Sequence, residues 1–399
     1  MIIAKNQKGV YASFLVVVAT KSIVDAFWGY KIGPLSMMAI QGVLIPILYY
    51  KIISERKKIP KDWLRTANIY FVALSFGIVW AVLTKPMNFV DYLISNLNIY
   101  IGFILIPLLV YDKKRLKQLL LAIMICGIFP ILVSIFQLQT GIIFGEERDT
   151  VGLTRYVGFY HDAFPVRFYG LLTIFSIILY QSVFIKTNLF LNIFMLFLGI
   201  GAVVSIYAVY SKAAVGIIVL WVLFVLIYSK SKMKQSFSIL IGLIGILIVF
   251  GDAVSDNIEQ LFSKEVGYKT GEVKDAKYTL AGRGYIWQEH WDFWTNKQSF
   301  FFQWFGDGVN RPTHNEFLRV LMLNGIIGFL VFIVFIFKTI TNIFKVYKNI
   351  RLFAFMLVGM YFVDCLGLVP GAYYYYNILV WGIFGTLLLR PHIFIKQYN

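Results

Sequence analysis

The stretch NEFLRVLMLNGIIGFLVFIVFIF, residues 315–337, contains one acidic and one basic side chain and is otherwise almost entirely apolar. It is longer than the roughly 20 residues that an α-helix needs to cross the apolar core of a bilayer. A long polar segment ends directly before it, and His314 is the last residue of that segment. The stretch therefore predicts a membrane-spanning helix that starts at the water-facing edge of the bilayer, with a titratable side chain at that edge.

The composition of the whole chain agrees with a membrane protein. Hydrophobic residues make up 59% of the 399 positions and charged residues only 14%, whereas soluble domains average roughly 25% charged residues. The mean hydropathy is +0.74. Apolar stretches of spanning length recur at about 10–30, 32–50, 67–83, 90–111, 117–137, 165–185, 188–209, 213–229, 236–251, 315–337, 352–369 and 373–390. We therefore predict an all-α, polytopic membrane protein of about twelve spans.

The distribution of cations predicts the orientation of the chain. The formal net charge is +17, but the lysines and arginines collect in alternate short loops, as the positive-inside rule describes. Lys113, Lys114 and Arg115 illustrate one such loop, and Lys345 and Lys348 another. This pattern explains the positive charge without nucleic acid as a partner. It predicts a multi-pass protein with both termini in the cytoplasm.

The two cysteines give no sign of a disulfide or a metal site. Cys126 and Cys365 both lie inside predicted spans, far apart in the sequence, and their spacing matches no metal-binding pattern. The N-terminus lacks a short apolar region that ends in a small-residue cleavage site, so we expect the first span to be retained rather than removed as a signal peptide.

We expect one integral membrane domain over residues 1–399, decorated on its outer face. The orientation places two larger segments outside the cytoplasm, residues 138–164 and residues 252–313. In the second of these, Trp287, Trp291 and Trp294 recur at the spacing of one helical face. Indoles favour the level of the lipid headgroups. The segment therefore predicts an interfacial helix that forms one wall of an external site.

The start of the 315–337 span resembles a capping box. Thr313 is followed three residues later by Glu316, and in such a box both side chains satisfy free amides of the first helical turn. Glu316 is therefore expected to be structural rather than catalytic. The box places His314 at about the first helical position, where the helix dipole disfavours the imidazolium form. A neutral imidazole can act as a general base.

The order and spacing of three motifs resemble the O-antigen ligase and polymerase family. They are GRGYIW at 282–287, GDG at 306–308, and HNEFLRVLMLNGIIG at 314–328. The resemblance is strong over residues 282–330 and loose over the remaining layout. It implies a GT-C-like membrane fold and a glycosyltransferase that needs neither a metal nor a cofactor. It also implies substrates on the outer face of the cytoplasmic membrane, with an undecaprenyl diphosphate-linked glycan as donor and a second glycan as acceptor.

The resemblance also suggests roles for individual residues. His314 would take the proton from the attacking sugar hydroxyl, with Thr313, Asn315 and Glu316 as caps and support. Arg283 would stabilise the negative charge that grows on the diphosphate as it leaves.

Two weaker motifs suggest further diphosphate ligands. Arg155 lies in a segment similar to the family's Arg-x-x-Gly. Lys212 stands where the family usually has arginine, and a lysine offers a point charge instead of a planar fork.

The reaction itself remains open at this level. We favour a polymerase that joins lipid-linked repeat units into a surface polysaccharide such as O-antigen, with membrane lipid and a chain-length regulator protein as further partners. A ligase that transfers glycan to lipid A core and a protein O-oligosaccharyltransferase are alternatives within the family. A lipid-linked glycan flippase or another transporter is an alternative of a different class, because about twelve spans is also common among transporters.

Overall fold

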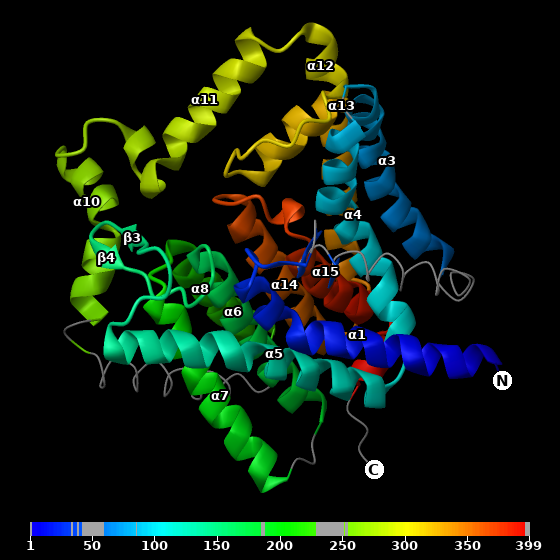
Figure 1. Ribbon diagram of the computed structural model, residues 1–399. Helices are drawn as coiled ribbons and strands as arrows, with labels where there is room; N and C mark the ends of the chain where they lie inside the picture. The colour runs from blue at the N-terminus through cyan, green and yellow to red at the C-terminus, as the bar shows by residue number, and fades with distance from the viewer. Residues whose placement is uncertain are drawn as a thin grey trace. The chain divides into compact units, whose positions relative to one another are not determined.

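The computed structural model describes residues 2–32, 35–37, 40–41, 60–84, 86–184, 188–228, 251 and 254–395 (Figure 1). These residues are mainly helical, and the strands are two hairpins of two-residue strands. The long helices are α1 (Ile2–Ala26), α3 (Lys61–Thr84), α4 (Pro86–Leu109), α5 (Lys113–Thr140), α6 (Ala163–Val183), α7 (Leu189–Ala208), α8 (Lys212–Tyr228), α13 (Glu316–Ile343), α14 (Lys348–Cys365) and α15 (Tyr374–Leu389).

Each of these helices falls on one of the predicted apolar stretches, while most of the predicted span 32–50 and nearly all of 236–251 lie outside the described residues. Six described segments are long and apolar enough to cross a membrane: Gly9–Ala26, Lys61–Leu83, Lys113–Thr140, Ala163–Val183, Leu189–Ala208 and Glu316–Ile343. The chain is therefore a helical membrane protein, as its composition predicts. The total of about twelve spans, the GT-C-like arrangement and the position of the termini remain predictions.

The chain divides into two compact units that alternate along the sequence. Unit 1 contains Met1–Ile53, Leu109–Ser263 and His392–Asn399, and unit 2 contains Ser54–Leu108 and Lys264–Pro391. No linker-like composition in the sequence marks the points where the chain passes from one unit to the other.

Unit 1 is built on close contacts between α1, α5, α6 and α7. The Ser22 hydroxyl on α1 donates to the Cys126 carbonyl on α5 at 2.5 Å. At Gly127 on α5, the space that a Cβ would fill is taken by the Thr173 hydroxyl of α6. Small residues at helix crossings allow membrane helices to approach closely, so Gly127 fixes the distance between α5 and α6.

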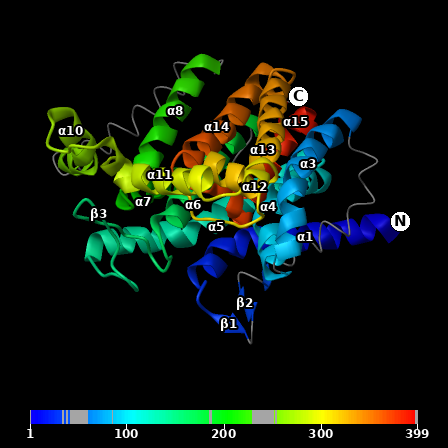
Figure 2. The same ribbon diagram turned by 90° about the horizontal axis from the view of Figure 1, so that it is seen from above.

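Unit 2 is built around α13, which lies alongside α3 (Figure 1) and beside α14 (Figure 2). Aromatic rings fill the space between these helices and α15. The ring centroids of Tyr70 and Phe335 are 5.0 Å apart, those of Phe335 and Trp381 are 5.3 Å apart, and those of Tyr361 and Trp381 are 5.1 Å apart. This core packs around the C-terminal half of α13.

Helix α13 is broken at Gly325, where φ is 68° and ψ is 179°. The segment that follows α12 (Phe300–Phe305) enters this break, and the Gly308 amide donates to the Leu323 carbonyl at 3.1 Å. The Asn324 side-chain oxygen accepts from the Tyr92 hydroxyl at 2.6 Å. Irregular backbone inside a membrane is tolerated where other protein groups form hydrogen bonds with its free polar groups. The contacts at Leu323 and Asn324 are bonds of this kind. The GDG motif at 306–308 therefore packs against the break in α13 and has a structural role there.

We expect Gly325→Ala to destabilise the protein by about 1–3 kcal/mol from backbone conformation alone, because that combination of φ and ψ is open only to glycine. The new methyl group would in addition overlap the Trp304 carbonyl oxygen. Thermal unfolding of the purified protein in detergent measures the effect. Gly199→Ala is the matched control, because its Cβ would meet only Ile177 at 3.6 Å. Equal unfolding midpoints for the two variants would contradict this account of the break.

The two predicted external segments contain local structure. Residues 138–164 include a hairpin of β3 (Asp149–Thr150) and β4 (Leu153–Thr154). In residues 252–313, of which 252 and 253 lie outside the described part, the chain forms short helices before it reaches α13. They are α10 (Ser263–Thr270), η2 (Ala276–Tyr278), η3 (Leu280–Gly282), α11 (Arg283–Asn296) and α12. The tryptophan stretch is thus helical as predicted, and its place at the membrane surface remains a prediction.

Candidate functional site

Arg283 is the first residue of α11, after a run of three residues with positive φ. Leu280 has φ 53°, Ala281 has φ 59° and Gly282, the N-cap, has φ 77°. Non-glycine residues in this region cost energy and often occur at functional sites. The run turns the chain abruptly into α11. It brings the Arg283 guanidinium against Gly367, where a Cβ would lie 2.7 Å from Nη1.

Gly284, the second glycine of the Gly-Arg-Gly motif, is required by a close backbone approach. A Cβ at this position would lie 2.7 Å from the Lys277 Cα of η2. A larger residue would push η2 away from the start of α11. The motif therefore folds the segment back on itself and fixes the position of Arg283.

Asn315 is the N-cap of α13, and its side-chain oxygen accepts from the Leu318 amide at 3.1 Å. The predicted capping box of Thr313 and Glu316 is therefore wrong. The Thr313 hydroxyl donates to the Asn315 carbonyl at 2.7 Å, and Glu316 is the first helical residue. Asparagine is at least as good a cap as threonine, so the helix begins two residues later than the box implies.

His314 consequently lies outside the helix, and not at its first position. Its φ is 49°, which is the left-handed region that non-glycine residues seldom adopt. The side chain is half-buried. His314 still directly precedes a helix N-terminus, where the dipole disfavours a positive charge.

A hydrogen bond connects His314 to α11. The Trp287 indole Nε1–H donates to the His314 carbonyl at 3.1 Å. Arg283 precedes Trp287 by four residues, so both lie on the same face of α11, about 6 Å apart along the helix axis. The structure thus brings the predicted base and the predicted cation of unit 2 to the same side of one helix.

A buried ion pair lies in the first two turns of α13, directly after His314 and Asn315. The side chains of Arg319 and Glu316 are each 1% exposed, with Nη2–Oε1 at 2.6 Å and Nε–Oε2 at 2.9 Å. Arg319 also donates to the Asn96 side chain on α4 at 2.7 Å. The Gly371 amide donates to Glu316 at 3.2 Å. Glu316 forms this pair and does not cap the helix.

A second imidazole lies on α11. Burial lowers the pKa of His290 below its usual range; Glu289 opposes this shift and the positive charge of Arg311 adds to it. His290 is therefore neutral at pH 7, and the sequence analysis gave it no role. Among the described residues, no three His, Cys, Asp or Glu side chains lie close enough together to hold a metal ion.

Arg155 and Lys212 belong to unit 1, where they meet at the turn between α7 and α8. The Arg155 guanidinium donates to the Tyr210 carbonyl at 3.3 Å. Arg167, on α6, donates to the Ser211 hydroxyl at 3.3 Å, and Lys212 is the next residue. The sequence analysis assigned no role to Arg167, because only the packing of α6 brings it to this turn. Arg283 and His314 belong to unit 2.

A protein family matches part of the chain. The sequence model of a family described as O-antigen ligase matches residues 193–333. This region contains most of α7, all of α8, α10, α11 and α12, and most of α13, and with them Lys212, Arg283 and His314; Arg155 lies before it. None of the curated proteins matches the chain. The family match supports the resemblance seen in the motifs, over residues 193–333 of the chain.

Proposed function

We propose that this protein is an O-antigen or surface polysaccharide polymerase. It is a glycosyltransferase that joins undecaprenyl diphosphate-linked repeat units on the outer face of the cytoplasmic membrane. The observation that carries the proposal is the hydrogen bond between Trp287 and His314. This bond joins the backbone of His314, whose side chain is half-buried, to the face of α11 that bears Arg283, within the region that matches the family.

In the proposed reaction, His314 accepts the proton of an acceptor sugar hydroxyl. The hydroxyl oxygen attacks the anomeric carbon of the donor as the bond from that carbon to the diphosphate oxygen breaks. One glycosidic bond forms, one glycosyl phosphate bond is lost, and undecaprenyl diphosphate leaves. In-line displacement inverts the configuration at the anomeric carbon. The imidazole releases its proton to solvent before the next turnover.

The diphosphate gains negative charge as the bond breaks, and a preorganised cation lowers the energy of that state. Arg283 supplies such a cation from a helix start that the preceding turn holds rigidly. Arg155 and Lys212 remain proposed diphosphate ligands of unit 1. The diphosphate-linked donor, the glycan acceptor, the surrounding lipid and a chain-length regulator protein are the partners that this reaction would use.

We expect Arg283→Ala to weaken donor binding by about 10–100-fold, because hydrogen bonds to charged groups contribute roughly 1.5–3 kcal/mol. The donor affinity of Arg283→Lys should lie between those of the wild type and Arg283→Ala, because lysine keeps the charge and loses the bidentate fork. Titration of the purified variants with undecaprenyl diphosphate measures the loss. Lys274→Ala is the control, because Lys274 is an exposed cation in the same external segment. An unchanged dissociation constant in Arg283→Ala would exclude the proposed role.

The family description favours a second candidate, an O-antigen ligase. Both reactions use the same donor and the same base, and they differ in the acceptor. The polymerase assignment is supported by the 18% aromatic content, which suits an enzyme that recognises one particular repeat unit.

The surface polysaccharide of a deletion strain distinguishes the two candidates on a gel. Glycolipid that carries a single repeat indicates a lost polymerase. Bare core, with polymer left on its carrier, indicates a lost ligase. A normal ladder would contradict both and would favour a transporter.

A further inference from the structure

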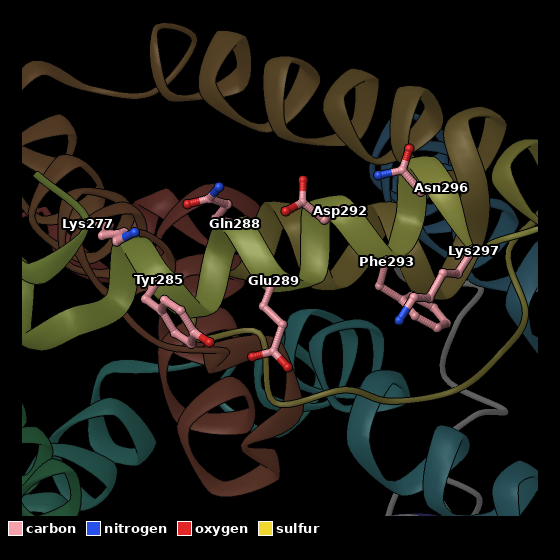
Figure 3. Close-up of a pocket in the computed structure, with 8 residues that line it drawn as sticks. All are labelled: Lys277, Tyr285, Gln288, Glu289, Asp292, Phe293, Asn296 and Lys297. Atoms are coloured by element: carbon pink, nitrogen blue, oxygen red, sulfur yellow. The ribbon is translucent and has the colours of Figure 1, made fainter. Parts of the chain in front are cut away.

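A polar pocket lies along α11, on the side away from Trp287. Its volume is about 380 Å³ (Figure 3). The residues that line it are Lys277, Tyr285, Gln288, Glu289, Asp292, Phe293, Asn296 and Lys297. Figure 3 shows Gln288, Asp292 and Asn296 along one edge of the helix, and Tyr285 and Phe293 along the other. The helical spacing of these residues places them opposite the face that carries the three tryptophans.

Both ends of the pocket are fixed by contacts outside α11. At one end, Lys277 forms an ion pair with Asp275 at 3.1 Å, and the close approach at Gly284 holds its backbone against the helix. At the other end, the Arg311 guanidinium lies 4.9 Å from the centre of the Phe293 ring. Arg311 is in turn held by Asp307 at 2.6 Å. The lining therefore comes from two segments of unit 2, η2 and α11, and Arg311 contacts Phe293 from a third.

Five polar side chains of the pocket are not used by the protein itself. The side chains of Gln288, Glu289, Asp292, Asn296 and Lys297 are exposed, and within the described part of the chain they make no hydrogen bond or ion pair. They offer carboxylate acceptors, amide donors and acceptors, and an ammonium donor, all in one place.

The lining matches a carbohydrate better than it matches other ligands. Two carboxylates and two ammonium groups balance in charge, so a polyanion such as a diphosphate gains little there. An apolar peptide or an acyl chain would desolvate five polar side chains without replacing their hydrogen bonds, at a substantial cost. Sugar hydroxyls both donate and accept, and the apolar C–H face of a pyranose ring can stack on Tyr285 or Phe293, rings that present an apolar face.

We propose that this pocket binds the carbohydrate part of a lipid-linked glycan several rings away from its reacting end. The inference rests on the proposed function. Tyr285 and Lys297 are about 18 Å apart along the helix axis at 1.5 Å per residue, a length that holds several linked sugars. The opposite face of α11 contacts His314 through Trp287. A glycan in the pocket therefore lies about one helix diameter, some 10–12 Å, from the base. The pocket would retain the growing chain between transfers.

The test is a calorimetric titration of the purified full-length protein with the strain's own surface glycan, released from its lipid by mild acid. We expect the double variant Tyr285→Ala/Asp292→Ala to bind at least about tenfold more weakly, because it loses a stacking surface and a charge-assisted hydrogen bond. Tyr268→Ala/Glu272→Ala, which removes an exposed tyrosine and an exposed carboxylate outside the pocket, should bind like wild type. In cells, the pocket variant should also shorten the polysaccharide ladder.

Equal affinities of the pocket variant and the wild type would overturn the proposal, and so would a wild type that binds no glycan. His314→Ala separates this result from the proposed function. If the pocket binds glycan, this variant should titrate like wild type whether or not it is active. An active His314→Ala protein would contradict the proposed base. The titration would still show whether the pocket binds glycan.

Discussion

Replacing His314 with alanine is expected to reduce glycan transfer by about 10²–10⁴-fold, the usual contribution of a positioned general base. The side chain is half-buried and lies outside the helix, so its removal opens no large cavity. The Trp287 hydrogen bond goes to the His314 carbonyl, which alanine keeps. Donor binding should therefore remain close to wild type. Single-turnover transfer and donor titration on the same preparation measure the two effects separately.

His290→Ala is the matched control for this prediction. Both imidazoles belong to unit 2, and the lowered pKa of His290 makes it neutral and able to accept a proton at pH 7. If His314 is the base, the His290 variant keeps most of the transfer rate. If His314→Ala kept the wild-type transfer rate and His290→Ala were inactive, His290 on α11 would be the base and the assignment of His314 would be contradicted.

Breaking the ion pair below the site is expected to have the largest effect on stability. Glu316→Gln or Arg319→Met should each lower the free energy of unfolding by about 3–5 kcal/mol, because each leaves one buried charge without its partner. Arg319→Met would also remove the hydrogen bond to Asn96, whereas a glutamine at position 316 could still accept from the Gly371 amide. Chemical unfolding in detergent, followed by tryptophan fluorescence, measures the loss.

The double variant Glu316→Leu/Arg319→Met tests the cause of that loss. Replacing a whole buried pair with apolar side chains of similar volume is often close to neutral. The double variant should therefore recover most of the stability lost by either single variant. If the three variants were equally unstable, packing volume and not the uncompensated charge would explain the effect.

Hydropathy predicted the long helices because a membrane helix depends mainly on a long apolar run, which is a local property of the sequence. The break in α13 depends on contacts instead. Gly325 reads as one more small residue in an apolar run, and only the approach of residues 304–308 gives it a non-helical backbone. The buried pair Lys21 and Asp25 of α1 was overlooked for a similar reason, since its carboxylate is also held by Tyr169 at 2.5 Å, 144 residues away.

The apolar run from residue 315 predicts a helix start next to His314, and α13 begins there. The three residues of positive φ before Arg283 have no counterpart among the predictions. The predicted start of α13 was two residues too early, because Thr313 and Asn315 are both good N-cap residues and the sequence alone does not decide between them. Arg167 and His290 were given no role because packing, and not a motif, brings them to their neighbours.

The most direct test of the proposed function is a reconstituted reaction. Purified protein in liposomes would be incubated with undecaprenyl diphosphate-linked single repeat units, with a chelator present and no other protein. We predict glycans of two or more repeats on one carrier, with one undecaprenyl diphosphate released for each bond formed, and no product with His314→Ala. Single repeats that stay unchanged with the wild-type protein, or polymer that forms only after a divalent cation is restored, would contradict the account.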